Sequence, residues 1–325
     1  MSRSKKKGVL SKTARAIRSL WKDETKKCGI EDDEAYCERW KKKYGMSRIP
    51  AILLVTIPKS GSIFLAGTVH DCAEFPHNSE LINLNFPNTY INDHHLGRFS
   101  ERGGITQLHT SPAIASLAAI CLMLDRMWLH IRDPRNTLVS WLHFLDQINT
   151  KYTAPITADH IPYIGEIWRK GGFEEKIELC IEYFYKDCLE WLNGWFTAMG
   201  MDFSGKYVSV DQRASGDSGG GYRLRGDWVA AQDKRFSHQP LNSPKVLLTS
   251  QEDLVKCGHQ AVFDAMMDFY DMPRSSFSIS PPNKGENAHF RRGAVDSWKT
   301  ELPAGYQERI TALLPREWRD YFGWL

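Results

Sequence analysis

Residues 51–62 read AILLVTIPKSGS. The first seven are a nearly continuous apolar run, which is typical of a strand buried on both faces in a parallel sheet covered by helices. A short polar turn follows, and a helical pattern begins near Ser62. This order of strand, turn and helix predicts a doubly wound α/β fold, in which ligands bind beyond the carboxyl ends of the strands.

A second unit of the same kind begins at residue 127. Residues 127–131 (MWLHI) predict another buried strand, and an apolar helix follows the turn at residues 132–134. The two units together predict a P-loop-like parallel sheet with helices on both faces. Further strands are expected at residues 206–210 and 245–249, and helices at residues 9–22, 33–44, 174–196, 253–269 and 303–325.

The length and composition of the chain allow one large domain or two smaller ones. It has 325 residues, of which 42% are hydrophobic and 25% charged, an ordinary profile for a globular protein. We predict a basic helical extension at residues 1–48 and one α/β domain at residues 49–325. Residues 211–244 are rich in Gly, Ser and charge, and are expected to form a long loop or a lid.

The charge of the chain is small overall and uneven along it. A net charge of +3 is too small for a dedicated nucleic-acid binder, so we expect no nucleic-acid partner. Lysine runs at residues 5–7 and 41–43 favour either contact with an anionic surface or, more simply, a solvated terminus.

The sequence predicts a cytoplasmic protein without a membrane span. No stretch approaches the roughly 20 apolar residues that a span needs, and no apolar block follows the N-terminal basic residues, so we expect no signal peptide. The seven cysteines form no CxxC pair and are odd in number, which favours reduced thiols. Asp93-His94-His95 has no spaced partner that would complete a metal site, so we expect a polar loop there and no metal.

The turn at residues 58–62 has the chemistry of an anion site. A helix that starts near Ser62 would offer unpaired N–H groups and the positive end of its dipole to a phosphate or sulfate. Gly61 permits a positive φ and close approach of the anion, the hydroxyls of Ser60 and Ser62 can donate, and Lys59 supplies a mobile charge. The turn is not the GxxxxGK[ST] loop, because its Lys precedes its Gly. A turn that only caps its helix and binds nothing stays open as the alternative.

Arg132 and Ser140 form a second candidate site. If a helix begins near Pro134, which is a favoured first-turn residue, Ser140 lies nearly two turns along it. An Arg fork and a hydroxyl in that arrangement could share one phosphate. Pairing of Arg132 with Asp133 or with a neighbouring helix is equally open.

Three ordered segments resemble the signatures of the cytosolic-type sulfotransferases that use PAPS (3′-phosphoadenosine 5′-phosphosulfate). Residues 56–62 (TIPKSGS) resemble the 5′-phosphosulfate loop of that family, and residues 130–140 (HIRDPRNTLVS) its 3′-phosphate motif. Residues 290–299 (FRRGAVDSWK) are similar to its third signature, and residues 251–254 (QEDL) to its Tyr-Glu-Asp-Leu helix. The resemblance covers about residues 50–320.

The resemblance implies transfer of the sulfuryl group of PAPS to a hydroxyl or amine of a small-molecule acceptor, with PAP as product and no metal. It implies that Lys59 neutralises charge on the leaving phosphate and that His109, in residues 107–112 (QLHTSP), takes the proton of the acceptor. A neutral imidazole suits that role near neutral pH. Family members often form dimers, so a homodimer stays open.

The remaining site residues implied by the resemblance bind the nucleotide. Ser60, Gly61 and Ser62 would bind the 5′-phosphate, and Ile63 and Phe64 would complete the loop. Arg132 and Ser140, together with the late loop of Arg291, Arg292 and Gly293, would bind the 3′-phosphate. Phe64 would stack on the adenine, and Gln251 would help to hold it.

The sequence also departs from the family pattern. Gln107 stands where many members have a Lys, Ile63 replaces a hydroxyl residue, and Gln251 replaces a Tyr. Asp296-Ser297 replaces the usual Gly-Asp. These departures bear on cofactor affinity more than on the type of reaction.

Two alternatives stay open: a binding protein of the same fold that has lost catalysis, and a nucleotide kinase-like enzyme, which would need a carboxylate for Mg²⁺.

Overall fold

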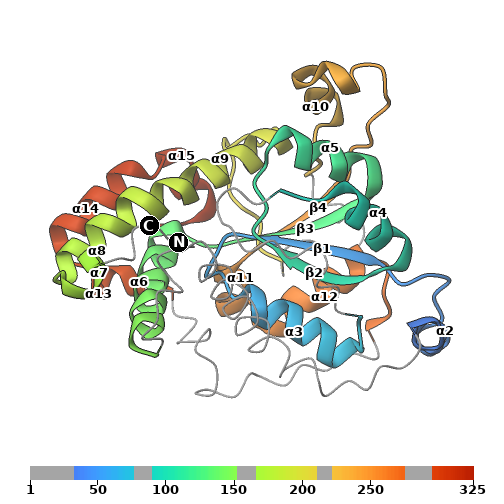
Figure 1. Cartoon of the computed structure of the whole chain (residues 1–325), viewed down its shortest axis with the longest axis horizontal. Coiled ribbons are helices and arrows are strands. Elements are labelled where there is room, and N and C mark those ends of the chain that lie inside the picture. Colours follow the sequence, from blue (N-terminus) through green and yellow to red (C-terminus); the bar gives the residue numbers. More distant parts are fainter. Residues whose placement is uncertain (1–32, 77–89, 152–165, 211–221, 275–294) are drawn as a thin grey trace, which may run out of the picture.

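A four-stranded parallel sheet forms the centre of the computed structural model (Figure 1), which describes residues 33–76, 90–151, 166–210, 222–274 and 295–325. The strands are β1 (Ala51–Thr56), β2 (Gly104–Leu108), β3 (Arg126–Ile131) and β4 (Lys245–Ser250), in the order β2-β1-β3-β4. Every pairing between them is parallel. The prediction of an α/β fold with a parallel sheet is confirmed.

Alternate side chains of the strands enter two separate hydrophobic cores, which is what a sheet covered on both faces requires. On β1, Leu53 and Val55 belong to the core formed with α4, α5 and the C-terminal helices. Ile52 and Leu54 belong to the core formed with α2, α3 and α12 on the other face. Figure 1 shows α3 and α12 on one side of the sheet and α4 and α5 on the other.

The helices before residue 180 are α2 (Asp33–Tyr44), α3 (Ser62–Ala73), α4 (Asp93–Arg102), α5 (Ile114–Met123), α6 (Pro134–Lys151), α7 (Glu166–Lys170) and α8 (Phe173–Cys180). The later ones are α9 (Lys186–Met199), α10 (Gly226–Gln232), α11 (Gln251–Lys256), α12 (His259–Phe269), α13 (Ser297–Glu301), α14 (Ala304–Leu313) and α15 (Arg316–Phe322). No helix among the described ranges is both long and apolar enough to span a bilayer.

The register of the sheet brings the carboxyl ends of its strands to one edge. Val55 pairs with Leu108, Thr56 with His130, and His130 with Thr249. The turn after β1, residue 109 after β2, residue 132 after β3 and residue 251 after β4 therefore all leave the sheet at this edge. The fold thus gathers predicted site residues of four separate segments, namely Lys59, His109, Arg132 and Gln251.

The predicted strands differ from the observed ones in two places. Residues 206–210 are not a strand, because the backbone N–H of Tyr207 donates to the carbonyl of Tyr321 in the last turn of α15 instead of joining a ladder. The strand β2 was not predicted. It has only five residues, and Gly103 and Gly104 before and at its start, both at positive φ, obscure the β pattern.

Three predicted helices are interrupted in the structure. A π-helical turn at Ile181–Tyr185 lies within residues 174–196, between α8 and α9. The helix predicted at residues 253–269 is two helices separated at Gly258, whose φ is 86°. Pro315 separates α14 from α15, because proline has no backbone N–H to continue a helix.

Part of the predicted N-terminal extension, residues 33–44, packs against the α/β fold. The helix predicted at residues 33–44 is confirmed as α2, but it is part of the packed domain, because the indole of Trp40 and the hydroxyl of Tyr44 both donate to the carbonyl of Ala73, at 2.9 and 3.0 Å. The helix predicted at residues 9–22 lies outside the described residues.

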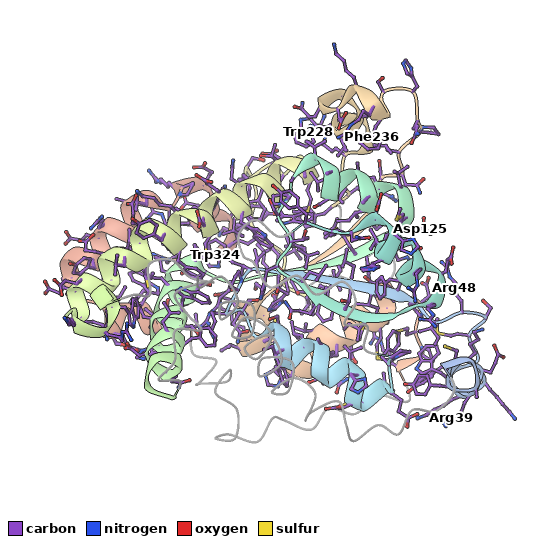
Figure 2. All side chains as sticks on the ribbon, viewed as in Figure 1. Arg39, Arg48, Asp125, Trp228, Phe236 and Trp324 are labelled. Carbon is purple, nitrogen blue, oxygen red and sulfur yellow. The ribbon has the colours of Figure 1, made fainter. Side chains whose placement is uncertain are left out.

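The segment predicted as a long loop at residues 211–244 is partly helical. Its described portion contains α10, and Val229 of this helix is buried in the core while Trp228 and Phe236 pack against it. Figure 2 shows these two aromatic side chains at the outlying end of the molecule.

Candidate functional site

The turn that joins β1 to α3 has two residues in the left-handed backbone region. Lys59 has a φ of 63° and Gly61 a φ of 85°, and the hydroxyl of Ser60 donates to the carbonyl of Ile57 at 2.7 Å. Left-handed residues that alternate with right-handed ones form a concave nest of N–H groups, which suits an anion. A non-glycine residue at positive φ costs free energy, which points to a functional turn.

The helix α3 begins at this turn, as predicted, with Ser62 as its first residue and Gly61 as its N-cap. No side chain caps the helix end. In the described part of the chain, the backbone N–H groups of Ser60 and Gly61 have no protein acceptor. The turn therefore offers donors and a positive dipole end to a ligand.

Gly61 is a sharp test of this geometry. A Cβ at this position would lie 2.8 Å from Oε1 of Gln251, and the φ of 85° is unfavourable for any L side chain. We expect Gly61→Ala to lower the free energy of unfolding in urea by about 1–3 kcal/mol. Gly67→Ala in the middle of α3, where nothing lies within 4 Å of the added Cβ, should instead be neutral or raise it by about 0.5–1 kcal/mol. Equal effects of the two changes would contradict the assigned backbone strain.

The side chain of Lys59, a residue of this turn, is partly buried. Its Nζ is 4.2 Å from the centroid of the Phe144 ring, on α6. Burial, and next the charge of Arg132, lower the pKa of Lys59 to about 8. The ammonium is thus poorly solvated, and a bound anion would stabilise its charge.

His109 follows β2 and is held by the end of β1. Its Nδ1 lies 2.8 Å from the carbonyl oxygen of Thr56. A carbonyl can only accept, so Nδ1 carries the proton and Nε2 carries the lone pair. Burial and, to a lesser extent, the nearby charge of Lys59 outweigh the hydrogen bond to the Thr56 carbonyl and lower the pKa of His109 to about 4, so the imidazole is neutral at pH 7.

Gln107 lies next to this lone pair. Its amide nitrogen is 3.4 Å from Nε2 of His109 and 3.3 Å from the hydroxyl of Thr56. Gln107, which stands where many members of the resembled family have a Lys, therefore places a neutral hydrogen-bond donor beside the candidate base His109.

Arg132 connects the second predicted site to the first. Its Nη1 donates to the carbonyl of Lys59 at 2.7 Å, and its side chain is buried. The alternative of an Arg pairing with Asp133 is realised by a different residue, because the fork of Arg135 binds that carboxylate at 2.8–3.2 Å. Ser140 lies on α6, which begins at Pro134 as predicted.

The residues after β4 close the other side of the turn. Oε1 of Gln251 is buried beside Gly61 and has no hydrogen-bond partner among the described residues. Ser250 caps α11 reciprocally with Asp253: the Asp253 N–H donates to the Ser250 hydroxyl, and the Ser250 N–H donates to the Asp253 carboxylate. This capping box fixes where Gln251 leaves the sheet.

Two of the predicted adenine and loop residues lie on α3. Ile63 is partly buried, and the ring of Phe64 lies 4.8 Å from that of His259 and 6.2 Å from that of Phe263. Phe64 therefore packs on α12 with part of its ring accessible. The late loop of Arg291, Arg292 and Gly293 lies outside the described residues.

Two buried residues of this edge had no role in the sequence prediction. Both nitrogens of His130 are hydrogen-bonded, Nδ1 to the hydroxyl of Thr249 and Nε2 to the carbonyl of Ser60. Glu252 accepts from the backbone N–H of Asp133 at 3.3 Å, and burial, followed by repulsion from the Asp133 carboxylate, raises its pKa to about 7. The only sequence signal was a polar residue at the end of each apolar strand.

The loop predicted for Asp93-His94-His95 is the first turn of α4. The side chain of Asn92 caps this helix by accepting from the His95 N–H at 3.1 Å. Over the described ranges, no group of three or more His, Cys, Asp or Glu residues is arranged to hold a metal ion.

Comparisons with known proteins find similarity at the level of structure but not of sequence. No model of a protein family matches the sequence, and no curated protein matches it. The crystal structure of mouse sulfotransferase SULT7A1 complexed with PAP aligns with a TM-score of 0.46 and 15% sequence identity, over 84% of this chain and 85% of that chain.

Proposed function

We propose that this chain is a PAPS-dependent sulfotransferase, which moves a sulfuryl group to a hydroxyl or amine of a small-molecule acceptor. One observation carries the proposal. A neutral histidine whose Nε2 has the lone pair and a poorly solvated lysine lie together where β1 and β2 end, beside a turn built to bind an anion.

The residues of the turn fit the anionic end of PAPS. The N–H groups of Ser60 and Gly61 can donate hydrogen bonds to a phosphate or sulfate. The positive end of α3 and the ammonium of Lys59 would stabilise its negative charge. Oε1 of Gln251, buried beside Gly61 and unpartnered among the described residues, can only accept a hydrogen bond, so we assign Gln251 to the adenine and not to the anion. PAPS, when bound, supplies the activated sulfuryl group.

His109 and Lys59 divide the chemistry between them. His109 accepts the proton of the acceptor at Nε2, while Thr56 holds the ring through Nδ1. Lys59 stabilises negative charge that develops on the leaving phosphate, in a site where burial strengthens the interaction. Arg132 holds the Lys59 carbonyl and, with Ser140, is proposed to bind the 3′-phosphate.

The decisive experiment is incubation of the protein with labelled PAPS and a panel of hydroxyl and amine acceptors. Transfer of label to any acceptor supports the proposal. Stabilisation by PAP without transfer would favour a binding protein that has lost catalysis, and neither binding nor transfer would overturn both. A cytoplasmic location and a homodimer stay predictions.

The two pKa values define a pH profile for kcat/KM, which reports the free enzyme. The base must be neutral, so activity falls as the pH drops below about 4; Lys59 must be charged, so activity falls as the pH rises above about 8. The profile should be measured with an aliphatic alcohol, which does not titrate in this range. In Lys59→Arg, whose guanidinium stays charged, the residual activity should lack the alkaline limb. An alkaline limb that persists unchanged would show that another group titrates.

A further inference from the structure

A buried chain of hydrogen bonds runs through β3 and β4 to the anion-binding turn. The indole Nε1 of Trp128 lies 2.7 Å from the hydroxyl oxygen of Thr249, and that oxygen lies 2.7 Å from Nδ1 of His130. Nε2 of His130 lies 2.9 Å from the carbonyl oxygen of Ser60. All four residues are buried, and His130 pairs with Thr249 in the sheet register.

The direction of every hydrogen bond in this chain is determined. The indole of Trp128 can only donate, so the Thr249 oxygen accepts from it. The carbonyl of Ser60 can only accept, so Nε2 of His130 carries the proton. Nδ1 of a neutral imidazole then accepts, and the hydroxyl of Thr249 donates to it. Burial lowers the pKa of His130 to about 3, which keeps the ring neutral and the arrangement constant at neutral pH.

The last bond of the chain sets the orientation of a peptide group in the turn. In a planar trans peptide the C=O and the N–H point in opposite directions. Because the Ser60 carbonyl points to His130, the N–H of Gly61 points away from the sheet residues that hold it. Arg132 does the same for the preceding peptide by binding the Lys59 carbonyl, which directs the N–H of Ser60 outward.

We propose that His130, Thr249 and Trp128 are positioning residues, which aim the N–H of Gly61 at the 5′-phosphate end of the bound nucleotide. The inference rests on the proposed function for the identity of that anion. A purely structural reading is that these buried polar groups only satisfy one another. The two readings differ in whether disrupting the chain weakens binding at one end of the nucleotide.

Thr249→Val tests this difference, because valine keeps the shape of threonine and removes both hydrogen bonds. The dissociation constants of PAP and of adenosine 3′-monophosphate, which lacks the 5′-phosphate, should be measured by calorimetry. We expect the constant for PAP to rise about tenfold, in line with the loss of a charge-assisted hydrogen bond. The constant for the monophosphate should change less than about twofold, and Thr249→Ser should restore PAP binding.

Thr106→Val is the matched control. Thr106 is fully buried on β2, and its hydroxyl has no hydrogen-bond partner among the described residues, so its loss should leave PAP binding unchanged. Should Thr249→Val not fold, Trp128→Phe removes only the first donor and is expected to weaken PAP by about threefold, with the same selectivity.

The outcomes separate the inference from the function on which it rests. A wild-type protein that does not bind PAP overturns the proposed function. A wild-type protein that binds PAP, together with a Thr249→Val protein that binds it equally well or loses both nucleotides in parallel, overturns the positioning role alone.

Discussion

Replacing Lys59 by methionine is expected to lower kcat for sulfuryl transfer by a factor of about 10²–10³, while the folded protein persists. Methionine has a similar length and keeps the backbone at this left-handed position occupied by a non-glycine residue. It removes the charge that would stabilise the leaving phosphate in a poorly solvated site, where a single electrostatic donor contributes about 10²–10³ in rate.

The same substitution should not lower stability. The folded-state pKa of Lys59 is below its unfolded value of 10.5, so the fold disfavours the charged form, and this cost is fully present below about pH 8 and relieved as the pH rises toward 10.5. At pH 7 the melting temperature of Lys59→Met should therefore equal or exceed that of the wild type.

Activity and melting temperature should be measured side by side with Lys42→Met as control, because Lys42 is an exposed residue of α2. The control should leave both unchanged. Retention of more than about a tenth of kcat by Lys59→Met would remove Lys59 from the mechanism, since one tenth corresponds to only about 1.4 kcal/mol.

His109→Asn is expected to lower kcat by about 10²–10⁴, the range that general-base catalysis contributes. The amide nitrogen of asparagine can take the place of Nδ1 and keep donating to the Thr56 carbonyl, whereas nothing replaces Nε2. The anchor of the residue is thus preserved and the base is lost. The dissociation constant of PAP should change less than about threefold, since the proton is taken from the acceptor.

The control for this change is His94→Asn on the exposed surface of α4, which should leave kcat unaffected. Full activity in His109→Asn would contradict the assignment of His109 as the general base. Equal losses in PAP affinity and in kcat would assign His109 to nucleotide binding instead of proton transfer.

Local sequence patterns predicted β1, β3 and β4, three of the four strands whose ends form the site. The apolar runs at β1, β3 and β4 are short and end at polar residues, which favours buried strands, and the polar turn after β1 could be recognised from Gly61 and its flanking hydroxyls. These signals are local, because burial on both faces and turn formation act over a few neighbouring residues.

Other features were not accessible in this way. The five-residue strand β2 is defined by its pairing with β1 more than by its own composition. Residues 206–210 have the composition of a strand, but their Tyr207 N–H is bonded to Tyr321, more than 100 positions away. The helix α2 is likewise held on the sheet domain by contacts of Trp40 and Tyr44 with Ala73, although its lysine run favoured an exposed arm.

The sequence alone thus predicted a parallel α/β sheet and a candidate anion-binding turn at Lys59-Ser60-Gly61, because strand burial and turn chemistry are encoded by adjacent residues. Only the folded arrangement established which nitrogen of His109 carries the proton, why the pKa of Lys59 is low, and that His130 holds the Ser60 carbonyl. These properties depend on burial and on contacts between strands that lie tens of residues apart in the chain, and such contacts exist only once the sheet has formed.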